Sequence, residues 1–262
     1  MFGADASGNR TFVSAVGYKV TANTYDDFGN VLSTVISGYE SDGTPVSRTT
    51  TFQYNGPLHQ LSQINGPRTD VSDITTFEYY PDNVAEGNNR ALLKRVTGPT
   101  GILQRDNIQY TATGKVQSES LPDGVTLAYT YYAGNDRMET LTETSSTGSR
   151  VSRWTYLNSG EVDSVTVGDG TPDATTTSFS YDAARRLTRI TDGLGNYIEY
   201  TLDTEGNQQA EKHYDITGTL HKALTQIFDI YSRLDTTTQA NETVDMDFAP
   251  DGTLDRESDG NA

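Results

Sequence analysis

Tyr25-Asp26-Asp27-Phe28-Gly29-Asn30-Val31-Leu32 sets a short pattern that decides the fold of this chain. The pattern begins with an aromatic residue, which is often followed by an aspartate. A short turn, a glycine, a polar residue and an apolar residue come after them. Weaker copies lie at 132–138 and 202–207. The residues that define the copies are Tyr25, Asp26 and Gly29; Tyr110 and Gly114; Tyr132; Tyr156 and Gly160; Tyr181 and Asp182; Tyr214, Asp215 and Gly218; Phe228 and Asp229; and Phe248 and Gly252. Self-similarity of this kind indicates a repeat protein.

The spacing of the copies limits the architecture. From Tyr110 the aromatic positions step to Tyr132, Tyr156 and Tyr181, at differences of 22, 24 and 25 residues. A period in the low twenties accommodates two strands and two turns, which is too short for a four-stranded propeller blade. Tyr214 falls between two of the regular positions, so one repeat can carry two copies of the turn.

The chemistry of the pattern predicts a β-hairpin turn. An aspartate can accept a hydrogen bond from the backbone two residues later, and a glycine tolerates the positive φ that closes the turn. The aromatic residue before the turn and the apolar residue after it can then form a cross-strand pair. Tyr181 to Leu187 keeps this frame with an arginine in the place of the glycine. Pro-Asp-Gly turns at 122–124 and 250–252 separate the copies.

The segments between turns alternate by two, as in Val125 to Tyr131, where every second residue is apolar or aromatic. This period predicts antiparallel strands with one wetted face, and no segment has a convincing helical period. The fold class is therefore all-β, with antiparallel hairpin repeats in a curved, twisted ribbon. We expect a single continuous array over residues 1–262, with clear repeats from about 25 to 254 and an inserted loop at 81–90.

The bulk composition excludes several classes of protein. Only 34% of the 262 residues are hydrophobic, and 16 tyrosines supply much of the apolar surface, so a thick aliphatic core is not expected. The formal charge of −17 disfavours binding to nucleic acid and to anionic membranes. No cysteine is present, which excludes disulfides and cysteine-bound zinc. No stretch predicts membrane insertion or a signal peptide, so we expect another export route or a piece of a longer chain.

At Tyr25, Tyr181 and Tyr214 the copies closely resemble the YD repeats of Rhs-type proteins. That family includes bacterial Rhs and wall-associated proteins, toxin-complex shell subunits and animal teneurins, and the resemblance covers about Tyr25 to Leu254. It implies a ribbon of hairpins that spirals into a shell. In the Rhs and toxin-complex members the shell encloses a C-terminal toxin, whereas other members mediate adhesion at cell surfaces. A secreted or cell-surface bacterial location is implied in the same way.

Two departures from the family pattern restrict what this resemblance implies. The chain is far shorter than a shell that could close around a toxin. It also contains no Asp-Pro dipeptide, so the self-cleavage of the family cannot be carried over to any residue here. We therefore expect no enzyme activity, no catalytic residue and no cofactor.

Two places in the sequence have side chains that could bind a metal ion. His213 and His221 flank a repeat turn and could approach each other on facing strands, although surface histidines on strands are the more common case. The turn aspartates and Asp245-Met246-Asp247 could ligate calcium, but no EF-hand loop or nonapeptide calcium repeat is present. No metal-binding residue is therefore predicted.

Two functions remain open from the sequence. The first is a non-catalytic structural segment of a YD-repeat shell that encloses or delivers a toxin, with neighbouring repeats or a C-terminal effector of a longer chain as partners. The alternative is a stand-alone module that binds carbohydrate or a cell-surface partner through exposed aromatic rings. In either case the terminal sheet edges predict edge-to-edge self-association unless they are covered.

Overall fold

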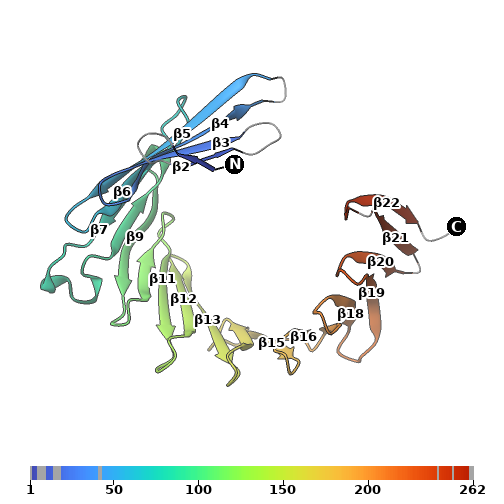
Figure 1. Cartoon of the computed structure of the whole chain (residues 1–262). Coiled ribbons are helices and arrows are strands. Elements are labelled where there is room, and N and C mark those ends of the chain that lie inside the picture. The colour runs from blue at the N-terminus through green and yellow to red at the C-terminus, as the bar shows by residue number, and fades with distance from the viewer. Residues whose placement is uncertain are drawn as a thin grey trace. The chain divides into compact units, whose positions relative to one another are not determined.

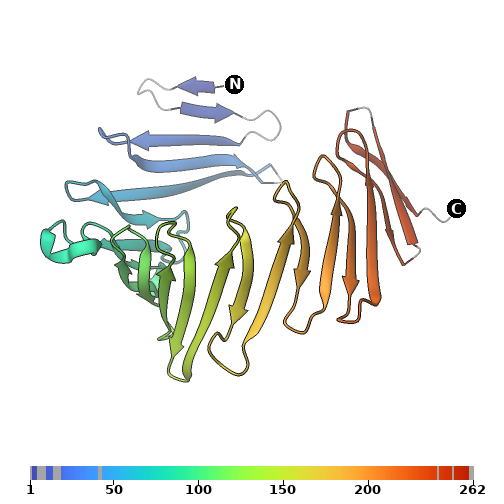
Figure 2. The ribbon, with the colours of Figure 1, turned by 90° about the horizontal axis from the view of Figure 1, so that it is seen from below.

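The computed structural model describes residues 2–4, 10–13, 19–40, 43–240, 242–249 and 251–259. Pro250 of the second Pro-Asp-Gly turn lies outside these residues. Apart from two short 3₁₀ segments, the regular secondary structure of the described residues is β-strand, and the chain divides into two compact units (Figures 1 and 2). The first unit is Met1–Tyr129 with Glu143–Gly148, and the second is Thr130–Thr142 with Ser149–Ala262. No helix in the described ranges is both long and apolar enough to cross a bilayer.

The first unit is a meander of hairpins with two short 3₁₀ segments. Its strands are β1 (Phe2–Ala4), β2 (Arg10–Val13), β3 (Val20–Tyr25), β4 (Val31–Tyr39), β5 (Pro45–Asn55), β6 (Gln60–Asn65), β7 (Ile74–Tyr79), β8 (Leu93–Thr97), β9 (Leu103–Tyr110), β10 (Val116–Ser120) and most of β11 (Thr126–Tyr131). The 3₁₀ segment η1 (Val84–Asn89) lies between β7 and β8, within the residues where the sequence predicts an insertion, and η2 (Pro99–Gly101) lies between β8 and β9.

The second unit continues the same hairpin pattern, and its later strands follow one another along an arc (Figure 1). Most of β12 (Met138–Ser145) belongs to it. Its other strands are β13 (Gly148–Tyr156), β14 (Val162–Val167), β15 (Thr175–Tyr181), β16 (Leu187–Thr191), β17 (Tyr197–Leu202), β18 (Gln208–Tyr214), β19 (Leu220–Phe228), β20 (Leu234–Gln239), β21 (Glu242–Phe248) and β22 (Leu254–Asp259).

Strand pairing confirms the predicted class. In each unit the paired strands are antiparallel and consecutive in the sequence, for example β3 with β4 and β21 with β22. The predicted cross-strand pairs are present, and a register shift accompanies each one. They are Tyr25 with Val31, Tyr110 with Val116, Tyr156 with Val162, Tyr181 with Leu187, Tyr214 with Leu220, Phe228 with Leu234 and Phe248 with Leu254.

The apolar core is as thin as the composition predicts. Among the described hydrophobic residues, only Tyr80, Val96, Ile108 and Ala210 are buried, and Ile108 alone is fully enclosed. Three of these lie in the first unit. A repeat sheet of this kind depends on contacts between neighbouring hairpins, because each hairpin cannot bury an apolar face by itself.

The meander places successive turns alternately at two edges of each unit. We call the edge with the turns from odd-numbered to even-numbered strands the aromatic edge, because Tyr25, Tyr110, Tyr156 and Tyr181 precede those turns. The turns from even-numbered to odd-numbered strands form the opposite edge. Tyr214 ends β18, so its turn lies at the opposite edge, which explains why it falls between the regular positions.

Candidate functional site

The turn after Tyr25 shows how the repeated residues act locally. The backbone N–H of Asp26 donates to the carbonyl of Asn30 at 2.9 Å, and Gly29 N–H donates back to the carbonyl of Asp26 at 3.1 Å. Gly29 has a φ of 86°, as the hairpin turn requires. Oδ1 of Asp26 accepts from the N–H groups of Phe28 and Asn30 at 2.9 and 2.8 Å. This carboxylate therefore satisfies two backbone donors that the turn would otherwise leave to water.

The same pair of backbone hydrogen bonds recurs at both edges. It is present in the turns that begin at residues 26, 40, 98, 111, 121, 157, 182, 192, 203, 215, 229 and 249. In five of the aspartate turns the last residue is asparagine or arginine, and its side chain donates back to Oδ2 of the aspartate. These are Asn30, Arg186, Asn196, Asn207 and Arg233. The fifth position therefore belongs to the turn motif, although the sequence pattern treats it only as polar.

The hydrogen bonds determine the charge state of the turn carboxylates. The side chain of Asn30 lowers the pKa of Asp26, and the side chain of Asn196 lowers the pKa of Asp192. The pKa of Asp215 lies well below its ordinary value because Thr217, His221 and the backbone of Thr219 all donate to it. Hydrogen bonds to an ionised carboxylate favour the charged form.

Tyrosine hydroxyls connect one hairpin to the next. Tyr54 donates to the carbonyl of Val31 at 3.1 Å, and Tyr79 donates to that of Leu61 at 2.9 Å. Each acceptor residue lies at the start of the strand after the preceding turn, as the first residue of that strand or, for Leu61 in β6, as the second. Among the described residues the set, which we call the tyrosine ladder, is Tyr54 to Val31, Tyr79 to Leu61 and Tyr110 to Leu93 in the first unit, and Tyr156 to Met138 and Tyr181 to Val162 in the second.

Four of the five ladder bonds end beside the register shift of the preceding hairpin, at Val31, Leu61, Leu93 and Val162. A bulge leaves one residue out of the regular strand pairing. The tyrosine of the following hairpin donates to the backbone carbonyl of the residue next to the one that is left out. Burial of the rings raises the pKa of Tyr79, Tyr110, Tyr156 and Tyr181. These hydroxyls are therefore protonated donors over a wider pH range than a free tyrosine.

Some predicted repeat residues lie outside the ladder. Phe228 and Phe248 have no hydroxyl, and Tyr25 is 44% exposed. The hydroxyl of Tyr132 donates to Trp154 in the hairpin that follows, at 2.9 Å, so its bond runs in the other direction along the chain. At the opposite edge, Tyr214 stacks on Tyr197 with ring centroids 4.7 Å apart.

The sequence pattern missed two members of the ladder, Tyr54 and Tyr79. Tyr54 is followed by Asn55-Gly56 and pairs with Leu61, whereas Tyr79 is followed by the insertion and pairs with Leu93. Neither has an aspartate directly after it or a glycine four residues after it, so the sequence pattern passes over both. A search for an aromatic residue and a later apolar partner at the repeat period would have identified them.

The histidines considered as metal ligands each bind a carboxylate. Nε2 of His213 lies 2.7 Å from Glu211, and Nε2 of His221 lies 2.9 Å from Asp215. Within the part of the chain that the structure describes, no three histidine or acidic side chains lie together in an arrangement that could hold a metal ion. The oxygen Oδ1 of Asp245 instead accepts from Thr236 at 3.2 Å.

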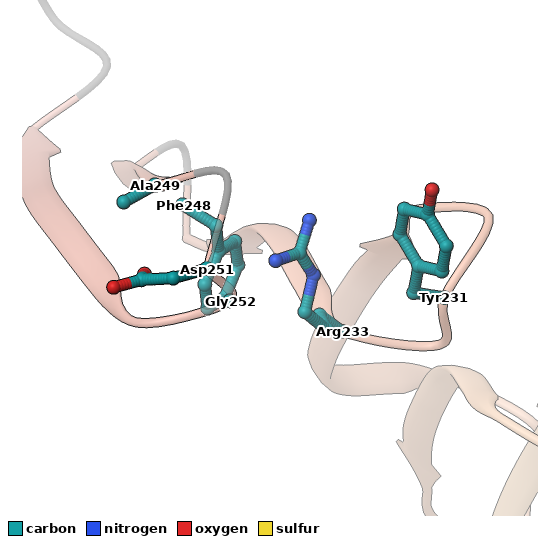
Figure 3. A pocket seen from close by; sticks show the side chains of 6 residues that line it. All are labelled: Tyr231, Arg233, Phe248, Ala249, Asp251 and Gly252. Carbon is teal, nitrogen blue, oxygen red and sulfur yellow. The ribbon is translucent and has the colours of Figure 1, made fainter.

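Open clefts lie between successive turns of the aromatic edge in the second unit. The larger has a volume of about 580 Å³, and its wall contains the guanidinium of Arg233 between the rings of Tyr231 and Phe248 (Figure 3). The carbon Cζ of Arg233 is 4.3 Å from the Phe248 ring centroid and 5.3 Å from that of Tyr231. Its lining residues are Tyr231, Arg233, Phe248, Ala249, Asp251 and Gly252. A second cleft of about 300 Å³ includes Arg137 and Tyr156 at the corresponding place.

Comparison with known families identifies one repeat directly. Residues 170–197 match the family described as RHS Repeat. This segment contains β15, the turn at 182–186 and β16, so the match falls on an aromatic residue, its aspartate and the cross-strand apolar partner. No curated protein matches the chain in sequence.

Solved structures with a similar fold include several titled with TcdB2-TccC3. The crystal structure of TcdB2-TccC3 has a TM-score of 0.50 and 13% identity, and the match covers 97% of this chain and 17% of that one. The form without the hypervariable C-terminal region has a TM-score of 0.50 and 14% identity, covering 92% and 15%. The TcdB2-TccC3-Cdc42 structure has a TM-score of 0.50 and 13% identity, covering 99% and 18%. The present chain thus spans less than a fifth of the length of these TcdB2-TccC3 chains.

Proposed function

We propose that the chain is a YD-repeat protein of the Rhs type and that it forms a non-catalytic segment of a shell wall. In this proposal the complete shell encloses or delivers a toxin, and it belongs to a secreted or surface-displayed bacterial protein. The partners of the segment are neighbouring YD repeats and a C-terminal effector of a longer chain.

The observation that carries this proposal is the tyrosine ladder. Each ladder bond joins a hairpin to the one before it through a backbone carbonyl, so the interaction can be repeated without a second layer of structure. A sheet that extends by identical steps and buries little apolar surface suits a wall better than a compact binding domain. The proposed single array over residues 1–262 follows from the same step being used in both units.

The length of the chain limits its part in the shell. It spans 17% of the TcdB2-TccC3 chain that it resembles in fold. The enclosure of a cargo would therefore depend on many further repeats, and this segment would supply part of the wall. We assign no catalytic residue to it.

The alternative, a module that binds carbohydrate by ring stacking, has less support from the geometry. The rings of Tyr79, Tyr110 and Tyr156 are partly buried and their hydroxyls are occupied in the ladder. Tyr231, which is 73% exposed at the larger cleft, is the ring best placed to stack on a sugar. A glycan screen that finds ligands lost on Tyr231→Ala substitution would revive this alternative.

The experiment that tests the wall proposal begins with the native gene product. Its mass is measured by immunoblot and mass spectrometry in the source cells and in the medium, and the particle is then treated with protease. We expect a product several times larger than 28.6 kDa. Its C-terminal part should resist proteolysis inside the particle and be digested rapidly when expressed alone.

Two results would contradict the proposal. One is a native product close to the mass of this chain, which could not enclose a toxin. The other is a larger product whose C-terminal part is cleaved as fast within the particle as in isolation.

A further inference from the structure

Arginines at the ends of turns reach to the next turn along the aromatic edge. Arg186 closes the turn at 182–186, and its Nη1 donates to the carbonyl of Asp203, the first residue of the following turn, at 2.6 Å. The same side chain donates from Nε to its own Asp182 at 2.7 Å. A single guanidinium, whose donors are held in a rigid fork, thus joins two turns that are separate in the sequence.

Two more arginines occupy the equivalent place in the second unit. Cζ of Arg137 lies 5.4 Å from the ring centroid of Tyr156, and a Cβ atom added to Gly160 would lie 2.4 Å from Nη2 of this arginine. Gly160 therefore makes room for the arginine of the preceding turn. Arg233 approaches the turn at 249–253 in the same manner, over the ring of Phe248 (Figure 3).

Other side chains bridge the turns between these arginines. Arg185 lies 3.4 Å from Glu161 of the preceding turn, and Asn207 donates to Ser232 of the following turn at 3.1 Å. From Arg137 to Gly252 each turn of the aromatic edge thus contacts the next. The first unit has related contacts: the Phe28 ring lies 3.7 Å from that of His59, and Gln60 donates to the carbonyl of Ala91 at 2.6 Å.

We propose that this row of side chains is a clamp that couples neighbouring hairpins and fixes their spacing at one edge of the sheet. In the second unit Ala210 is the only buried hydrophobic residue among those described, so packing between hairpins supplies little coupling there. Contacts between one turn and the next then supply a larger share of the coupling between hairpins. The opposite edge has such contacts too, for example from Ile216 N–H to Asn196 at 3.2 Å. The arginine that binds a turn of this edge in the second unit, Arg153, does so from within β13, where it joins Glu139 to Asp169. Among the described residues of this unit, no arginine of one turn at the opposite edge reaches the next turn.

The clamp is independent of the proposed enclosure of a toxin, because it concerns only the coupling of hairpins within this chain. Its test is hydrogen exchange on the 262-residue protein with Arg186→Asn. Asparagine at this position can keep the bond to the aspartate of its own turn, as Asn30 does with Asp26, but it has no second nitrogen in the place of Nη1 that could donate to the carbonyl of Asp203. The variant therefore removes the bridge and leaves the local motif in place.

We expect the amides of residues 203–207 to exchange about fivefold faster in Arg186→Asn, while those of 182–186 stay within about twofold of the parent protein. Arg150→Asn is the control, since Arg150 is exposed and has no side-chain partner among the described residues. Arg233→Asn should act in the same way on the turn at 249–253. The clamp is refuted if residues 203–207 exchange at the parent rate, or if the change is confined to residues 182–186.

Discussion

At the scale of single residues, backbone geometry and side-chain hydrogen bonds make separable contributions to each turn. Gly29 shows the first, because its φ is 86° and a Cβ atom there would meet no neighbour within 4 Å. Any cost of adding a side chain at this position is therefore backbone strain and not a steric clash.

Gly29→Ala should lower the free energy of unfolding by roughly 1–2 kcal/mol, the cost of a left-handed conformation for an L-residue. Ala91→Gly is the reverse test, because Ala91 has a φ of 59°. This substitution should relieve the same strain and raise the free energy of unfolding. Urea denaturation of both variants checks this. An unchanged midpoint for Gly29→Ala would show that the turn relaxes to another geometry.

Tyr156 tests the value of one ladder bond. Tyr156→Phe removes the hydroxyl that donates to Met138 and leaves that carbonyl without this donor. We expect a loss of roughly 1–2 kcal/mol in the free energy of unfolding, measured through the fluorescence of Trp154 in the same strand. Tyr231→Phe is the control and should change little, because its ring is 73% exposed and its hydroxyl has no bond among the described residues.

The turn aspartates predict a loss of stability in acid. Their pKa values are lower in the folded chain than in the unfolded chain, so they stabilise the fold at neutral pH. As the pH falls below about 5, the unfolded chain binds protons first and this stabilisation is lost progressively. The urea midpoint should therefore decrease from pH 7 to pH 3. Asp192→Asn should flatten this dependence, whereas Asp235→Asn, at an exposed position without a side-chain partner, should not.

At the scale of elements, the insertion between β7 and β8 is part of the sheet's packing. Asn89 at the end of η1 accepts from the N–H of Tyr110 at 2.9 Å and donates to Gln109 at 2.6 Å. Asn89→Ala should cost about 1–2 kcal/mol and increase exchange at the Tyr110 amide, whereas Asn88→Ala, at an exposed position, should do neither. Equal effects of the two substitutions would show that the insertion is only a loop.

The sequence predicts the elements better than the connections between them. The aspartate turns, the positive φ at Gly29 and the pair of Tyr25 with Val31 follow from local chemistry, which a single segment contains. The ladder does not, because each tyrosine donates to a backbone carbonyl 17 to 23 residues earlier. Every residue has such a carbonyl, so no residue type in the sequence marks the acceptor. The sequence does not reveal the arginine bridges either, because each arginine reaches a carbonyl, a ring or a glycine of another turn that is separate in the sequence.

At the scale of the whole molecule, the chain has 36 acidic and 19 basic residues and a fold with little apolar core. Self-repulsion of the net charge destabilises a compact state, and salt screens it. The surface ion pairs that salt would weaken are each worth little. We therefore expect added NaCl, up to about 0.3 M, to raise the urea midpoint, with the repulsive term outweighing the lost ion pairs.

Calcium separates this general screening from a specific site. The aspartates of the turns are already occupied by backbone N–H groups and side chains, and no described group of acidic residues has a metal-binding arrangement. CaCl₂ should therefore stabilise the chain no more than NaCl of matched ionic strength. A midpoint that rises further with micromolar to millimolar calcium, and reverses on chelation, would require a site among the turn aspartates, and their hydrogen bonds to the backbone would then have to be replaced by bonds to the ion.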